Sequence, residues 1–85
     1  MQLVRFVVAQ GDRYVSRNGT PTEAAQTAHE MDVAVACRLI RDLERLNPGR
    51  AFDLVERTHS FKLTPAGYTE HAGFRDTRVE PHRFH

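Results

Sequence analysis

The sequence predicts one α+β domain, in which a small antiparallel sheet of two hairpins packs against one main amphipathic helix. Three observations lead to this fold class. The 85 residues suffice for a single domain. Apolar and polar residues alternate towards both ends of the chain, as in strands, whereas residues 32–47 repeat with a helical period. We expect the domain to span residues 1–74 and the polar residues 75–85 to form a flexible C-terminal tail.

The first hairpin is predicted over residues 3–20. Val4, Phe6 and Val8 occupy alternate positions, and valine and phenylalanine favour strands. The pair Gly11-Asp12 suits a two-residue turn, which "RYVS" follows as a returning strand.

Residues 20–31 are compatible with two structures. Thr20 followed by Pro21 and Glu23 is typical of a helix start, and the alanines that follow support a short helix. The alternative is an ordered loop.

Residues 32–47 predict the main helix, which Asp32 can cap and "NPG" at 47–49 ends. Its apolar arc contains Val35, Ala36, Leu39, Ile40, Leu43 and Leu46. Three arginines, Arg38, Arg41 and Arg45, lie on the opposite side. We expect Leu39, Ile40, Leu43 and Leu46 to be buried against Phe6, Val8, Phe52 and Val55.

The second hairpin is expected to consist of Val55–Arg57 and Phe61–Leu63 around a turn at Thr58–Ser60. The strand period of two then turns Phe61 and Leu63 towards the helix and Lys62 towards solvent.

Composition and charge argue against an enzyme. A domain of this size buries only about 60% of its unfolded surface, which leaves little room for a deep pocket beside a core. Cys37 is the sole cysteine and has no histidine near it in sequence, so we expect it to be a packing residue. The five histidines form no compact ligand set, and we expect no cofactor and no metal. The net charge of +1 and the lack of a long apolar run favour a cytoplasmic protein that does not bind membranes.

Residues 4–56 carry a first resemblance. "FVVAQGDRYVSRNG", an alanine-containing connection, a helix and "NPGRAFDLVE" resemble the small ββαβ accessory proteins of bacteriophages and mobile elements. The resemblance implies a short non-catalytic protein that acts by binding a larger one.

Residues 22–67 carry a second resemblance. Leu43-Glu44 and the run "LTPAG" at 63–67 are similar to winged-helix regulators of the LysR and MarR types. This resemblance implies a recognition helix, a hairpin wing and DNA as the partner. The helix over 32–47 is neutral, with three arginines against Asp32, Asp42 and Glu44, so the wing is the better phosphate candidate.

We therefore expect a non-enzymatic binding module for a protein partner, with a winged-helix DNA-binding regulator as the alternative. The residues expected to contact a partner or phosphate are Arg38, Arg41, Arg45, Arg57 and Lys62.

Overall fold

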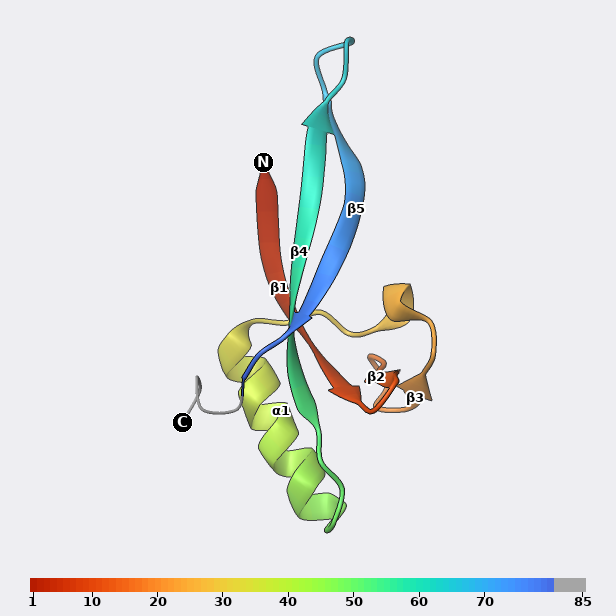
Figure 1. The fold of residues 1–85 in the computed structure, drawn as a ribbon, viewed down its shortest axis with the longest axis vertical. Coiled ribbons are helices and arrows are strands. Elements are labelled where there is room, and N and C mark those ends of the chain that lie inside the picture. Colours follow the sequence, from red (N-terminus) through yellow and green to blue (C-terminus); the bar gives the residue numbers. More distant parts are fainter. Residues whose placement is uncertain (81–85) are drawn as a thin grey trace.

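The computed structural model describes residues 1–80, and it has the predicted α+β fold (Figure 1). A five-stranded antiparallel sheet has the strand order β3-β2-β1-β4-β5. The strands are β1 (Gln2–Gln10), β2 (Arg13–Val15), β3 (Pro21–Thr22), β4 (Asp53–Leu63) and β5 (Thr69–Arg78). The helices are a 3-10 turn η1 (Ala25–Thr27) and the main helix α1 (Val33–Leu46).

The first hairpin and the main helix lie where the sequence places them. β1 and β2 are joined by a turn at Gly11-Asp12, in which Gly11 has a φ of 62°. α1 begins one residue after Asp32 and ends at Leu46, with Asn47 as its C-cap. The Asp32 side chain makes no capping hydrogen bond, however, and instead accepts one from Arg5 Nη1 at 2.9 Å.

Residues 20–31 form an ordered loop rather than a full helix. Threonine hydroxyls bond locally here: the Oγ1 atoms of Thr22 and Thr27 lie 2.9 Å apart, and Thr27 also donates to the Ala24 carbonyl. Such bonds compete with helical ones. The loop then runs along the outer edge of β1, where Phe6 and Met31 exchange two backbone hydrogen bonds of 2.9 and 2.8 Å.

α1 packs on one face of the sheet and forms the larger part of the core there. The buried side chains of this core are Val8, Val15, Met31, Ala36, Ile40 and Leu54. Phe6, Phe52, Leu39 and Leu43 are partly buried against them, which largely confirms the predicted contact between helix and sheet.

Two members of the predicted core are wrong. Leu46 is 71% exposed, because it is the last residue of α1 and lies at the margin of the sheet contact. Val55 is buried on the other face of the sheet, beside Val7, Ala9 and Ala28. The cause is the strand period of two, since its neighbour Leu54 already faces the helix.

The predicted turn at Thr58–Ser60 is also wrong. These residues lie inside β4, which runs without a turn from Asp53 to Leu63 and pairs with β1 on one side and β5 on the other. The chain turns instead at residues 64–68, where the Thr64 amide donates to the Tyr68 carbonyl at 2.8 Å. Leu63 is 73% exposed beside this turn and does not face the helix.

The predicted tail begins too early. Residues 75–78 belong to β5, and Asp76 lies opposite Arg57 of β4. The last five residues of that predicted tail, 81–85, lie outside the described residues.

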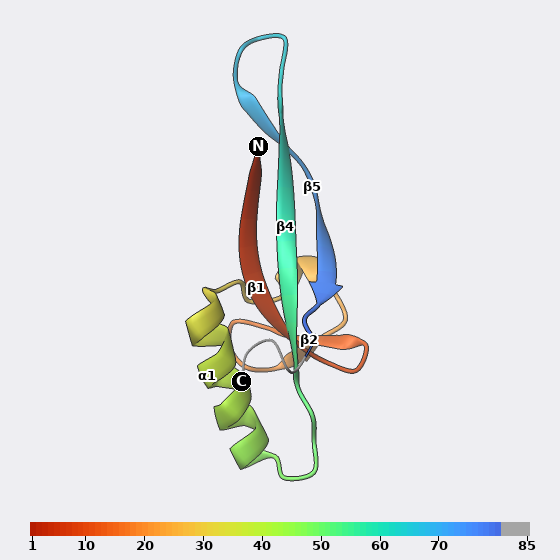
Figure 2. The ribbon, with the colours of Figure 1, turned by 60° about the vertical axis from the view of Figure 1, so that its left-hand side comes forward.

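The molecule is elongated, with extents of 52 × 25 × 18 Å. α1 lies against the lower part of the sheet only, while the β4–β5 hairpin projects well past the start of β1 (Figures 1 and 2). Within residues 1–80, no helix has the length and apolar character needed to cross a membrane.

Candidate functional site

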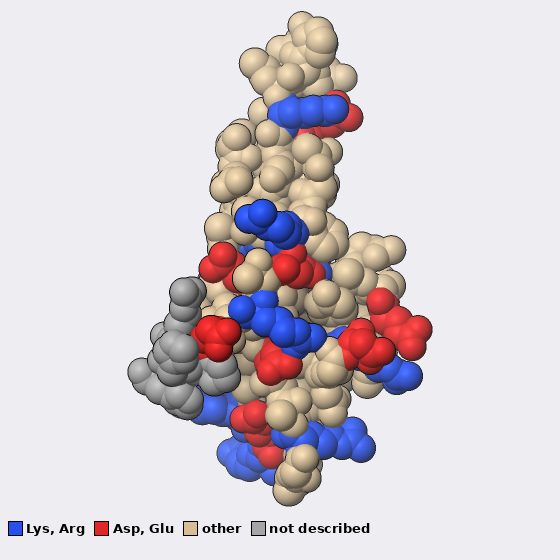
Figure 3. Space-filling view, viewed as in Figure 1, with Lys and Arg blue, Asp and Glu red and all other residues tan. Residues whose placement is uncertain are grey.

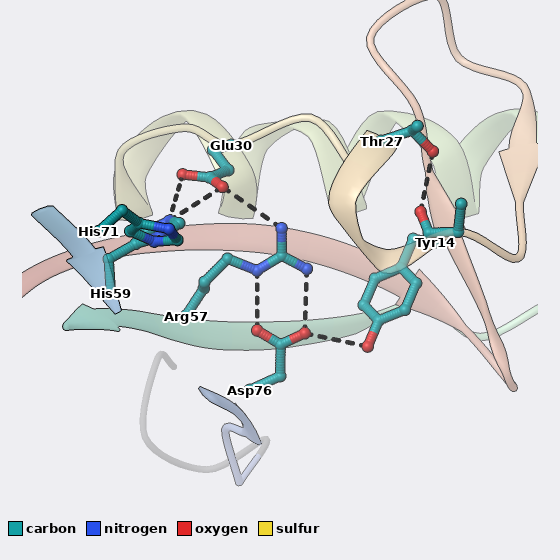
Figure 4. Close-up of polar contacts among 8 residues, drawn as sticks. Tyr14, Thr27, Glu30, Arg57, His59, His71 and Asp76 are labelled. Atoms are coloured by element: carbon teal, nitrogen blue, oxygen red, sulfur yellow. Dashed lines mark hydrogen bonds and ion pairs between the residues drawn. The ribbon is translucent and has the colours of Figure 1, made fainter. Parts of the chain in front are cut away.

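The face of the sheet opposite α1 carries a cluster of polar side chains centred on Arg57 (Figure 4). We name it the Arg57 cluster, and it comprises Tyr14, Glu30, Arg57, His59, His71 and Asp76. Because β4 is continuous, Val55, Arg57 and His59 alternate onto this one face. Arg57 has no exposed surface at all.

Asp76 is the main partner of the buried guanidinium. Arg57 Nε donates to Asp76 Oδ1 at 2.8 Å and Nη2 donates to Oδ2 at 3.0 Å, which is a bidentate pair. The Tyr14 hydroxyl donates to Asp76 Oδ2 at 3.0 Å. The carboxylate therefore receives three hydrogen bonds from two strands other than its own.

These bonds shift the pKa values of Asp76, Tyr14 and Arg57. Burial alone would raise the pKa of Asp76, but the hydrogen bonds from Arg57 and Tyr14 and the positive charge of Arg57 outweigh it and lower that pKa. Burial, together with the bond to Asp76, raises the pKa of Tyr14, so the phenol stays a donor. Burial alone would lower the pKa of Arg57, but the hydrogen bonds and negative charges of Asp76 and Glu30 outweigh it and raise that pKa.

Glu30 brings the loop before α1 into the cluster. It accepts a hydrogen bond from Arg57 Nη1 at 3.3 Å, and its Oε1 lies 2.9 Å from His59 Nε2. A neutral His59 that donates from Nε2 to Glu30 has Nδ1 free as an acceptor, and His71 Nε2 lies 2.9 Å from that atom. The chain of contacts thus runs from Asp76 to the exposed His71.

Aromatic rings complete the enclosure of Arg57. Its guanidinium carbon lies 4.1 Å from the centre of the Phe74 ring and 5.6 Å from that of Tyr14. All three guanidinium nitrogens already donate to carboxylates. The Arg57 cluster therefore links β5 and the loop at Glu30 to β4. The hydrogen-bonding groups of the Arg57 guanidinium are all used by Asp76 and Glu30 inside the cluster. Among residues 1–80, no three potential metal ligands form a group that could hold an ion.

The structure does not bring the five predicted contact residues together. Arg57 is wrong as a partner or phosphate contact, because it is fully buried in an ion pair. Arg38, Arg41 and Arg45 are exposed on the side of α1 away from the sheet, and Arg45 Nη2 lies 3.3 Å from Asp42. Lys62 is exposed on the projecting hairpin, directly opposite Glu70. A contact role for these four exposed residues stays a prediction.

Cys37 is a packing residue, as the sequence predicts. It is partly buried against the helix-side core.

A second feature, an apolar groove, lies between α1 and the β2–β3 connection. One hollow of about 270 Å³ is lined by Val15, Ser16, Arg17, Gly19, His29, Met31, Val35, Leu39 and Leu43. A neighbouring hollow of about 180 Å³ shares Val15, Gly19 and Leu43 and continues to Arg13, Arg50 and Phe52. We name the two together the α1 groove. The first hollow is lined mainly by apolar side chains, the second by apolar and polar ones, and the charged residues that line either hollow within the described part of the chain are all basic.

Sequence reasoning missed both features, although a signal for each is present. Arg57 and His59 follow Val55 at strand spacing, which indicates polar residues on an inner face. The turn predicted at residues 58–60 ended the strand at Arg57, so this alternation was not extended to His59. On α1, the apolar arc is wider than one sheet contact needs, and the surplus side chains line the groove.

No protein-family model, curated protein or solved structure matches this chain.

Proposed function

We propose that this chain is a non-enzymatic, cytoplasmic binding module that engages a protein partner, in the manner of small accessory proteins of phages and mobile elements. The α1 groove carries this proposal, which places the protein partner there and leaves Arg38, Arg41 and Arg45 as contacts of the DNA-binding alternative only. The groove offers apolar side chains to solvent in a concave surface, and such surfaces are typical of sites for other molecules. The order β1, β2, β3, α1, β4, β5 contains the ββαβ order of that resemblance, with the short β3 added before α1 and β5 added after β4.

The Arg57 cluster supports the non-enzymatic part of the proposal. It is the densest group of ionisable side chains in the described part of the chain, yet each strong group in it is bonded to another. A general acid or base has to reach a substrate. Here Arg57 is fully buried and Asp76 is held by three donors.

A winged-helix DNA-binding protein is the second candidate, and one observation favours it. The β4–β5 hairpin projects beyond the body, as a wing does (Figure 1). Figure 3 shows basic and acidic side chains mixed over the body, and the tip of the hairpin is uncharged. Lys62 faces Glu70, so the hairpin offers phosphate little net positive charge.

Two measurements test the proposal. Labelled DNA duplexes titrated at about 150 mM salt are expected to bind no more tightly than the roughly 10⁻⁶–10⁻⁴ M of non-specific contacts. Nanomolar binding to one duplex sequence, lost in an Arg38→Ala/Arg41→Ala/Lys62→Ala variant, would establish the winged-helix alternative.

The second measurement looks for the protein partner directly. A photo-crosslinking amino acid is placed in living host cells at position 17, on the α1 groove, and in a matched variant at position 41, on the exposed back of α1. Position 17 is expected to yield a discrete protein adduct that position 41 does not yield. Adducts with nucleic acid, or the same protein adducts from both positions, would count against the proposal.

A further inference from the structure

We infer that the α1 groove binds a peptide segment of the partner that is acidic and carries two apolar side chains. This inference rests on the proposed function, and it adds the chemistry of the bound segment. The evidence is the shape of the groove, the stripe of α1 that forms it, and the sign of the charges around it.

The stripe of α1 that lines the groove overlaps the stripe that packs on the sheet only in part, because Leu39 and Leu43 line the groove and also pack against the core. Ala36 and Ile40 face the sheet and are buried. Val35 and Leu39 lie beside them on the helix, and Leu46 shares their side at 100° per residue. Val35, which lines the groove, is 43% exposed, and Leu46, which lies outside the groove lining, is 71% exposed, so this edge of the apolar arc is open to another molecule.

The groove consists of two neighbouring hollows that share Val15, Gly19 and Leu43 in their linings. The first has Met31, Val35 and Leu39 in its lining, and the second has Phe52. Burial of apolar surface favours binding, so each hollow favours an apolar side chain of the ligand. Two apolar side chains of one peptide, joined by its backbone, can occupy both neighbouring hollows.

The wall formed by the β2–β3 connection is held in shape before any ligand arrives. The Ser16 amide donates to the Thr20 carbonyl at 3.0 Å, and the Gly19 amide donates to the Ser16 carbonyl at 2.9 Å. The hydroxyls of Ser16 and Thr20 donate to Asn18 Oδ1 at 2.6 and 2.8 Å. A wall ordered in this way lowers the entropic cost of binding.

The charges around the groove select an acidic occupant. Arg13, Arg17 and Arg50 line it, and no carboxylate among residues 1–80 does. Within the same residues Arg17 and Arg50 have no ion-pair partner, and Arg13 has only Glu23 at 3.6 Å, with both side chains largely exposed. Asp42 of α1 does not line the groove, and its carboxylate is paired with Arg45. Aspartate or glutamate on either side of the apolar residues complements this rim.

Selection from a random 16-residue peptide display library tests the inference. Enriched peptides are expected to carry net negative charge and at least two apolar residues. Their affinity is expected to fall at least tenfold in an Arg17→Glu/Arg50→Glu variant and in a Val35→Asp variant. All three positions are exposed, so these variants should fold. The matched control is Arg38→Glu/Arg41→Glu, which reverses two charges on the back of α1 and should leave affinity within about twofold.

Chemical-shift mapping with an enriched peptide locates the site. The largest shifts are expected at Val15, Leu39 and Leu43, and none at Lys62. Enrichment of basic or uncharged peptides, no enrichment at all, or equal losses in test and control variants would overturn the inference. So would self-association of the chain through this groove in sedimentation. In each case, a crosslinked protein adduct from position 17 would leave the proposed function standing, whereas nanomolar duplex binding would remove the function itself.

Discussion

Arg57 and Asp76 face each other across β4 and β5, and two parallel hydrogen bonds of 2.8 and 3.0 Å join their side chains where Arg57 has no exposed surface. This pair lies on the face of the sheet opposite α1, the face that also carries the small core of Val7, Ala9, Ala28 and Val55. A bidentate pair fixes the relative position of its two strands, because a slip in register would break both bonds. We therefore infer that the pair of Arg57 and Asp76 fixes the register of β5 relative to β4.

The first prediction concerns this ion pair. Arg57→Ala leaves the Asp76 carboxylate without its main partner and opens space in the core, so the free energy of unfolding should fall by about 3–5 kcal/mol. Urea unfolding followed by circular dichroism measures the change. The control is Arg75→Ala, which removes an exposed arginine on β5 next to Asp76 and should cost less than about 0.5 kcal/mol. Equal losses in the two variants would show that the pair does not hold β5 in place.

The second prediction concerns acid. The pKa of Asp76 is lowered below its ordinary value of 3.8 in the folded state, so the unfolded chain takes up this proton at higher pH than the folded one. The stability that the carboxylate contributes is therefore complete above about pH 4 and is lost as the pH falls through the lowered native pKa. Unfolding midpoints measured from pH 5 to pH 2 should decline less steeply in Asp76→Asn than in the unaltered protein. Parallel declines would contradict the lowered pKa.

The third prediction separates the two ends of the apolar arc of α1. Ile40→Ala removes a side chain that is 5% exposed, and it should cost about 2–5 kcal/mol. Leu46→Ala, which removes a side chain that is 71% exposed, should change the free energy of unfolding by less than about 0.5 kcal/mol. Thermal melts of both variants provide the comparison. A large loss from Leu46→Ala would mean that the end of α1 packs more closely than the structure shows.

Local sequence signals sufficed for the elements whose structure is set locally. Gly11-Asp12, the helical period predicted over residues 32–47 and the stop at Asn47-Pro48-Gly49 each act within a few residues, and the structure has the turn, the helix over Val33–Leu46 and the stop. The errors have a long-range cause. Thr58, His59 and Ser60 look like a turn by composition, yet β1 and β5 pair with them from both sides. Tertiary pairing overrides such local preferences.

The candidate sites show the same division. The Arg57 cluster joins residues up to 62 positions apart, as in the bond from Tyr14 to Asp76, and no local pattern specifies which carboxylate meets which arginine. The exposure of Arg38, Arg41 and Arg45 follows from helical periodicity and was predicted. The burial of Arg57 depends on the continuity of β4, and the turn-like residues 58–60 predicted a break in that strand instead.

The fourth prediction concerns the projecting hairpin and uses amide hydrogen exchange. The middle of β4 lies between two strands, so the Val55 and Arg57 amides should exchange slowly, near the rate set by global unfolding. Phe61 donates its amide to the carbonyl of Met1, which immediately precedes β1, and should be protected only moderately. Leu63 lies beyond the end of β1, and by alternation its amide points to that unpaired side, so it should exchange rapidly.

Lys62 supplies an internal control for this measurement. By the same alternation its amide points towards β5, where Glu70 is its partner, so it should exchange more slowly than the amide of Leu63. Exchange rates that rise from Arg57 through Phe61 to Leu63, with Lys62 exchanging more slowly than Leu63, would establish that β4 is continuous and is held on both sides only in its first part. Rapid exchange at Arg57 together with a protected α1 would instead mean that the whole hairpin opens independently of the body, and the register role assigned to the pair of Arg57 and Asp76 would be wrong.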